Sequence, residues 1–177
     1  MTFLESIRTC LRKFATFSGR AARAEFWWFV LFVVLVAFAL SFVDAALFGG
    51  GSVSVDGDPR QPITGLWQLL TLLPLLAAAW RRMHDTGRPG WYALLPMIVS
   101  VAVLFFLMIG VAGFGLAGRA GADAGVLGQL AGAFGAAGAL IFAVAMIFLP
   151  LVLIWWLSRP SEPAPNAFGP PPHEVHP

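Results

Sequence analysis

Four long apolar stretches decide what this chain can fold into. They run from about Phe26 to Phe48, from about Ile63 to Trp80, from Trp91 to about Gly115, and from about Leu130 to Leu157. Runs of about 20 apolar residues are typical of helices that cross a bilayer, because a helix satisfies its own backbone polar groups where water is absent. Even the shortest run covers roughly 27 Å as a helix. We therefore predict an all-α membrane protein with four transmembrane helices.

The composition agrees with this fold class. Hydrophobic residues make up 59% of the 177 residues and charged residues only 11%, compared with about 25% charged in soluble domains. The net charge of +2 is too small for a basic nucleic-acid surface, so we expect no nucleic-acid partner. Cys10 is the single cysteine and has no internal disulfide partner. The first span starts too late and is too long for a cleaved signal peptide, so we expect it to remain as an anchor.

The basic residues predict the orientation, because segments rich in lysine and arginine stay on the cytoplasmic side. One side would carry Arg8, Arg12, Lys13, Arg20, Arg23, Arg81, Arg82, Arg88 and Arg159. The other would carry only Arg60 and Arg119. Both termini and the segment between the second and third spans should therefore face the cytoplasm. Six tryptophans fall at that same boundary, as expected for the headgroup level: Trp27, Trp28, Trp80, Trp91, Trp155 and Trp156.

The segment before the first span predicts an amphipathic helix. Residues 3–17 place apolar side chains on one face at steps of three or four, with basic side chains opposite. Thr2 and Glu5 have the spacing of a capping box, which predicts a helix start at Thr2. We expect this helix to lie in the bilayer interface, with packing on the protein's own loops as the alternative. The predicted regions are this cytoplasmic flank (1–25), a four-span domain (26–157) and a disordered, proline-rich cytoplasmic tail (158–177).

The interior of the spans offers few reactive groups. Asp44, near the outer end of the first span, is the one ionisable residue that comes close to the bilayer interior, which argues against ion-coupled transport. Pro74, Pro96 and Pro150 predict kinks in the later spans. Small residues at every fourth position of span four predict close packing, within the bundle as the favoured interpretation or in a homo-oligomer. These positions are Gly128, Gly132 and Ala136 on one ridge and Ala131, Gly135, Ala139 and Ala143 on the next.

The densest chemistry lies in the stretch WRRMHDTGRPGW, residues 80–91. A catalytic interpretation uses His84 and Asp85 as an acid–base pair, but no nucleophile is evident, and the DTG triplet of aspartic proteases needs two aspartates held in tight β-structure. A binding interpretation places Arg81 and Arg82 at the level of anionic headgroups, since the planar arginine fork suits phosphate. A structural interpretation needs only arginines that fix topology and a glycine–proline turn.

Three stretches resemble the signatures of a bacterial inner-membrane family called domain of unknown function 805. They are FSGRAARAEFWWF (17–29), RRMHDTGRPGW (81–91) and PNAFGPPP (165–172). The matching positions are Gly19, Arg20, Arg23, Phe26, Trp27, Arg81, Arg82, His84, Asp85, Gly90, Trp91, Asn166 and Gly169. Met83 replaces a usual leucine, Pro89 replaces a frequent serine, and the Gly/Ala-rich stretch 110–138 is longer than usual. The resemblance implies a bacterial inner-membrane protein, no established reaction, and a defined polar cluster that includes the histidine and the aspartate.

Our leading hypothesis is a non-catalytic inner-membrane protein whose cytoplasmic polar cluster binds an anionic phospholipid headgroup or a protein partner. The candidate site consists of Arg20, Arg23, Arg81, Arg82, His84 and Asp85. A small transporter or channel component is one alternative, and a lipid-modifying enzyme that uses His84 and Asp85 is another. We expect no cofactor and no metal site. His173 and His176 in the tail are three residues apart, but the prolines around them break any helix that would align them.

Overall fold

The computed structural model describes residues 1–48, 61–119 and 125–172, and its regular elements are helices. Their order is α1 (Phe3–Arg12), α2 (Arg23–Phe48), α3 (Pro62–Asp85), the short 3₁₀ helix η1 (Gly90–Leu94), α4 (Leu95–Arg119) and α5 (Gly125–Ser158). The chain divides into two compact units. The first unit comprises Met1–Gly90 with Leu157–Pro177, and the second comprises Trp91–Trp156.

Four helical stretches among the described residues are long and apolar enough to cross a membrane. They are Arg23–Phe48, Pro62–Asp85, Gly90–Gly110 and Ala137–Ser158. Large apolar side chains point outward along them, for example Leu35 and Phe38, of which 52% and 63% are exposed. Such continuous apolar surfaces are typical of a lipid-facing protein rather than of a soluble one. The predicted all-α membrane fold is confirmed.

The end of α3 and the start of the third span differ from the prediction. Helix α3 continues past Trp80 to Asp85, and the third span begins with the 3₁₀ turn η1 before α4 starts at Leu95. Pro96 therefore lies in the first turn of α4, where a missing N–H removes no intrahelical hydrogen bond, so the kink predicted there has no basis. Pro74 and Pro150 do lie inside α3 and α5.

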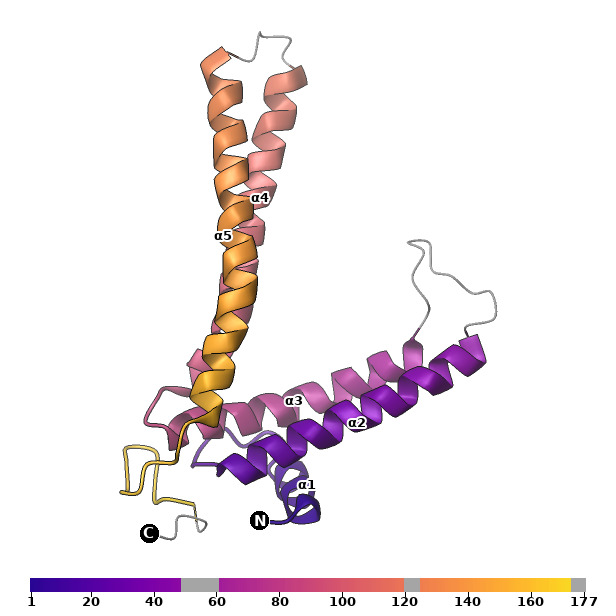
Figure 1. Ribbon diagram of the computed structural model, residues 1–177, viewed down its shortest axis with the longest axis vertical. Coiled ribbons are helices and arrows are strands. Elements are labelled where there is room, and N and C mark those ends of the chain that lie inside the picture. Colours follow the sequence, from indigo (N-terminus) through magenta and orange to yellow (C-terminus); the bar gives the residue numbers. More distant parts are fainter. Residues whose placement is uncertain (49–60, 120–124, 173–177) are drawn as a thin grey trace. The chain divides into compact units, whose positions relative to one another are not determined.

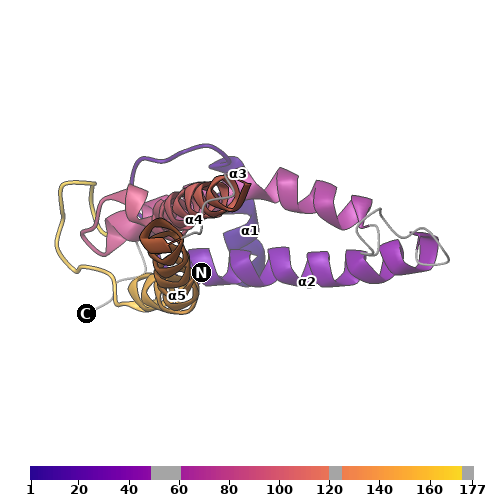
Figure 2. The same cartoon turned by 90° about the horizontal axis from the view of Figure 1, so that it is seen from above.

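Helices α2 and α3 lie side by side in both views of the first unit (Figure 1, Figure 2). The indole N–H of Trp67 in α3 donates to the Val33 carbonyl of α2 over 3.1 Å. At the other end, the buried Asp44 carboxylate accepts from the backbone N–H groups of Ile63 and Thr64, at 3.1 and 2.8 Å. Asp44 of α2 thus caps the N-terminus of α3, whose own N-cap residue makes no side-chain cap.

Helix α1 starts with the predicted capping box. The Thr2 N–H donates to Glu5 Oε2 over 2.8 Å, and the Glu5 N–H donates to the Thr2 hydroxyl over 3.4 Å. The backbone hydrogen bond from Thr2 holds the pKa of Glu5 below its usual value. The helix ends at Arg12 instead of residue 17. The chain then turns through Ser18 and Gly19, whose φ of +84° suits glycine and ends any helical continuation.

The inner face of α1 packs on the first turns of α2. Ser6 and Cys10 are fully buried there, and the Ser6 hydroxyl donates to the Ala24 carbonyl over 3.2 Å. The Phe3 ring meets Trp28 edge to face, with 5.8 Å between the ring centroids. The other apolar side chains of this segment, Leu4, Leu11 and Phe14, remain exposed.

Candidate functional site

The predicted site residues of the second signature lie on the last turn of α3 and not on a loop. Arg81, Arg82 and Asp85 are fully buried, and His84 is 8% exposed. The helix ends directly afterwards, because the Thr86 hydroxyl donates to the Met83 carbonyl and Gly87 adopts a φ of +70°. Residues 81–86, which the structural interpretation needed only to fix topology, therefore lie in the interior of the first unit.

Asp85 holds two arginines at once. Its Oδ1 accepts from Arg20 Nε over 3.0 Å, and its Oδ2 accepts from Arg82 Nη1. All three side chains are at most 1% exposed. A buried carboxylate between two guanidinium groups keeps its charge compensated, which a lone buried charge would not be.

A second buried ion pair lies next to the first and includes a residue that the sequence analysis missed. Arg81 Nη1 donates to Glu25 Oε1, and both side chains are buried. Arg81 Nη2 has no hydrogen-bond partner among the described residues. An acidic residue two positions after Arg23, at the start of an apolar span, is the signal that would have identified Glu25, because such a charge needs a partner.

The arginine cluster, defined as Arg20, Glu25, Arg81, Arg82, His84 and Asp85, also binds the C-terminal segment, residues 159–172. Arg20 donates to the carbonyls of Ala164 and Glu162, with 2.8 Å from Nη1 to the Ala164 oxygen. Arg82 donates to the carbonyls of Leu157 (2.9 Å) and Arg159. Two guanidinium groups thus bind backbone carbonyls in the described part of the tail, whose prolines predict an extended or disordered segment.

Asn166 fixes the same segment to the end of α3. Its Nδ2 donates to the His84 carbonyl over 2.9 Å and to Glu162 Oε2 over 2.8 Å. Asn166 and Gly169 exchange two backbone hydrogen bonds, which closes a tight turn with a φ of +133° at Gly169. Asn166 thus joins the third signature (165–172) to the second signature (81–91).

His84 does not pair with Asp85. Its Nδ1 lies 3.1 Å from the Gly19 carbonyl, which can only accept, so Nδ1 carries the hydrogen. The imidazole stacks on Phe168, with 3.9 Å between ring centroids and 3° between planes, and the Trp80 ring meets it edge to face. The acid–base pair of the catalytic interpretation is therefore not formed.

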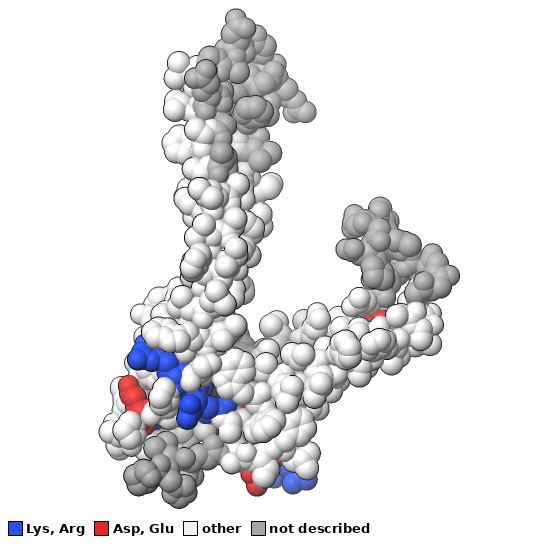
Figure 3. All heavy atoms as spheres, viewed as in Figure 1, with Lys and Arg blue, Asp and Glu red and all other residues white. Residues whose placement is uncertain are grey.

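Arg23 stands apart from the other five predicted residues. The structure brings Arg20, Arg81, Arg82, His84 and Asp85 together, whereas Arg23 at the start of α2 is exposed. Figure 3 shows lysine and arginine gathered at the end of the α2–α3 pair near α1, while most of both helices is white. Basic groups at this end thus form a buried set and an exposed set.

The other described features add no reactive group. Burial raises the pKa of the Cys10 thiol to about 12, and the nearby Glu25 charge acts in the same direction. Among the described residues, no three His, Cys, Asp or Glu side chains are grouped to hold a metal ion. The arginine cluster offers charge balance, with three arginines against Asp85 and Glu25, and not a free base or nucleophile.

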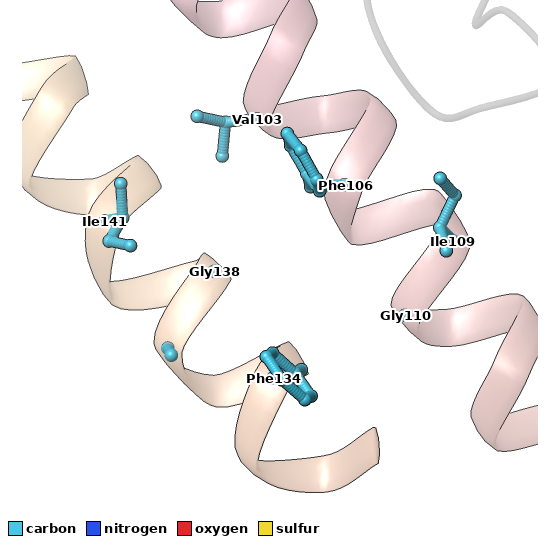
Figure 4. A pocket seen from close by; sticks show the side chains of 8 residues that line it. Val103, Phe106, Ile109, Gly110, Phe134, Gly138 and Ile141 are labelled. Carbon is cyan, nitrogen blue, oxygen red and sulfur yellow. The ribbon is translucent and has the colours of Figure 1, made fainter. Parts of the chain in front are cut away.

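The second unit contains an apolar groove of about 500 Å³ between α4 and α5. Figure 4 shows Val103 and Phe106 of α4 and Phe134 and Ile141 of α5 along it. At Gly138, an added Cβ would lie 3.3 Å from Leu107, so this glycine permits the close approach of the two helices. Gly138 belongs to neither predicted ridge, and Ala139 and Ala143 are exposed. The side chains of the other five ridge positions lie outside the described residues.

Four apolar spans and a compact charged end define this chain as a multi-pass integral membrane protein. The chain belongs to the family described as "Protein of unknown function (DUF805)", whose sequence profile matches residues 14–170. The resemblance found in the three signatures is confirmed. No solved structure matches the chain.

Two curated relatives are proteins of the Escherichia coli inner membrane. The chain is 34% identical over 98 residues to inner membrane protein YhaH of Escherichia coli strain K12, which covers 55% of this chain and 77% of that relative. It is 36% identical over 98 residues to inner membrane protein YhaI of the same strain, covering 55% of this chain and 75% of that relative.

Proposed function

We propose that this chain is a non-catalytic protein of the bacterial inner membrane that binds anionic phospholipid headgroups with its basic end. The single observation that carries the proposal is the division of the basic residues. The N–H groups of Arg20 and Arg82 donate to Asp85 and to backbone carbonyls, whereas Arg8, Arg12 and Lys13 are exposed. The exposed set is the better candidate for headgroups, because its charges are not already compensated.

The buried cluster has a structural role in this proposal. It ties the start of α2, the end of α3 and the C-terminal segment together, and so builds the end of the molecule that carries the exposed basic groups. Removing one partner of such a buried pair typically costs about 3–5 kcal/mol, because the other charge is left uncompensated. This accounts for a signature that specifies His84 and Asp85 without any catalytic use of them.

The orientation follows from the same charges. The basic end faces the cytoplasm in this proposal, since the positive-inside rule gives nine basic residues to that side and two to the other. The cytoplasmic leaflet is the surface to which anionic lipids attract basic segments.

Helix α1 is suited to the interface between headgroups and acyl chains. Leu4, Leu11 and Phe14 are 64%, 48% and 43% exposed, and Arg8 and Arg12 are exposed on the same short helix. Exposure of these apolar side chains to water is unfavourable. In the bilayer interface they enter the acyl region, while the two arginines contact phosphate groups. The inner face of α1 is already occupied by α2, so the helix stays anchored to the protein.

The test measures the lipids that accompany the full-length protein when it is extracted in a polymer with its native bilayer. We expect anionic lipids to be enriched around the wild type, and the Arg8→Gln/Arg12→Gln variant to lose most of that enrichment. The matched control is Arg60→Gln/Arg119→Gln, which removes two arginines assigned to the other side of the membrane. Equal enrichment in the two double variants would overturn the proposal.

No observation on the described residues favours the two alternatives. A lipid-modifying enzyme that uses His84 and Asp85 would need the two side chains in contact with each other or with a substrate path, and each is instead bonded to other protein groups. A transporter or channel component would need a polar path through the spans, and the charge nearest their interior, Asp44, is occupied as a helix cap.

A further inference from the structure

A shallow groove follows one face of α2 from its first residue inward. It is lined by Arg23, Ala24, Trp27, Trp28 and Leu31 and has a volume of about 420 Å³. These residues recur at steps of four along the helix, so they form one continuous strip. Along the span, the strip changes from a cation through two indole rings to an apolar side chain.

Arg23 is a free cation at the head of this groove. Its side chain is exposed and forms no hydrogen bond or ion pair with any residue that the structure describes. Glu25, the nearest acidic residue in the sequence, already accepts from Arg81 in the buried cluster. The charge of Arg23 is therefore available to an anion from outside the unit.

The order of side chains matches the layers of a phospholipid. A planar guanidinium group binds two phosphate oxygens at once. Indole rings favour the headgroup level, where an apolar ring and a polar N–H are both satisfied. Leu31 is 40% exposed, and the exposed Leu35 and Phe38 continue the apolar strip toward the middle of the span.

We propose that this groove holds one anionic phospholipid at a defined site. Its phosphate lies on the Arg23 guanidinium, its glycerol region lies against Trp27 and Trp28, and an acyl chain follows Leu31 and Leu35. The inference rests on the proposed function, because it names one tight site within a surface that attracts anionic lipid more loosely. A zwitterionic lipid has the same phosphate but carries its own cation, so it gains less from Arg23.

The test is native mass spectrometry of the full-length protein in detergent, titrated with phosphatidylglycerol or with phosphatidylcholine of the same acyl chains. We expect one phosphatidylglycerol to be retained more strongly than the rest, and Arg23→Gln to weaken that retention about fivefold, the effect of one basic residue at an anionic surface. Arg23→Lys keeps the charge and should lose less. Arg119→Gln, which removes an arginine assigned to the other side of the membrane, should leave the tight site unchanged.

A second measurement locates the lipid. Phosphatidylglycerol with a photoreactive group in one acyl chain is expected to cross-link to the peptide that contains Trp28, Leu31 and Leu35. Cross-links spread evenly over α2–α5, or equal loss of tight lipid in Arg23→Gln and Arg119→Gln, would overturn the inference. A second copy of the chain that excludes lipid from the groove would overturn it as well.

The outcomes separate the two proposals. If Arg8→Gln/Arg12→Gln lowers the general enrichment while Arg23→Gln leaves tight binding intact, the basic end binds lipid but the groove is not the site. If Arg23→Gln removes the tight lipid while Arg8→Gln/Arg12→Gln leaves the general enrichment unchanged, the groove is a lipid site. The proposal that α1 attracts anionic lipid is then wrong.

Discussion

Asp85 and Arg20 lie 65 residues apart in the chain and form a fully buried ion pair, with 3.0 Å between Asp85 Oδ1 and Arg20 Nε. Arg82 approaches the other carboxylate oxygen from the same helix. One carboxylate therefore joins the segment before α2 to the end of α3, and two arginines depend on it for compensation. Substitutions at this position test the structural role most directly.

Asp85→Asn is expected to destabilise the protein strongly. The amide keeps the shape of the side chain but leaves Arg20 and Arg82 without a counter-charge, which should lower the free energy of unfolding by about 3–5 kcal/mol. Unfolding in detergent, followed by tryptophan fluorescence, measures this loss. Glu5→Gln is the control, because it removes an exposed carboxylate and keeps the capping acceptor, so its effect should be much smaller. A stability of Asp85→Asn equal to that of Glu5→Gln would refute the structural role.

Gly90→Ala should displace Trp80. A Cβ at Gly90 would lie 2.0 Å from Trp80 Nε1, and that indole is held by ring contacts to Phe17 and His84. Overpacking of this kind typically costs about 1–3 kcal/mol. Gly65→Ala is the matched control, since a Cβ at Gly65 in α3 meets nothing within 4 Å and alanine favours the helix. The prediction fails if both alanine variants unfold at the same temperature as the wild type.

Cys10 should react very slowly with alkylating reagents in the folded protein. Burial raises its thiol pKa from 9.0 to about 12, so the reactive thiolate at pH 8 is roughly 1,000-fold scarcer than for an ordinary cysteine. The labelling rate should continue to rise with pH above 9, where an exposed cysteine levels off. Mass spectrometry of iodoacetamide-treated protein across this pH range measures the rate, and protein unfolded in dodecyl sulfate is the reference. A plateau near pH 9 in the folded protein would contradict the burial.

Gly138→Leu should loosen the contact between α4 and α5. Even a methyl group at Gly138 would lie 3.3 Å from Leu107, so alanine should be nearly tolerated, whereas leucine should cost about 1–3 kcal/mol. Ala139→Leu places the same side chain one residue further along, where the surface is exposed. Thermal unfolding of the two leucine variants distinguishes them. Equal stability would mean that the close approach at Gly138 has no energetic role.

The fold was predictable because it depends on composition over long windows. A run of about 20 apolar residues has few alternatives to a spanning helix, whatever its neighbours are. The capping box at Thr2 and Glu5 is local, and it was predicted correctly as well. The end of α3 was not, because Gly87, Pro89 and Gly90 made the whole stretch from Trp80 resemble a turn, while helix α3 continues to Asp85.

Five of the six members of the arginine cluster were predictable, whereas Glu25 and most of the contacts were not. Five of the six predicted residues meet, since Arg and Asp in an apolar chain must find partners. Their main acceptors, however, include the carbonyls of Glu162, Ala164 and Leu157, and every residue type has a carbonyl. No pattern among the described side chains of the tail predicts these arginine–carbonyl hydrogen bonds. Among the described residues of the tail, Asn166 does carry a signal, because its side-chain amide both donates and accepts.

The carbonyls that bind Arg20 and Arg82 have a further consequence for biosynthesis. The ribosome makes Arg20 and Arg82 long before residues 157–169, so α2 and α3 reach the membrane with acceptors still missing. Until residues 157–169 emerge, Asp85 can pair with the two guanidinium groups, but their carbonyl acceptors are still missing. Synthesis of residues 157–169 is thus the step that completes the arginine cluster, and a chain that stops before them would leave both arginines without these acceptors.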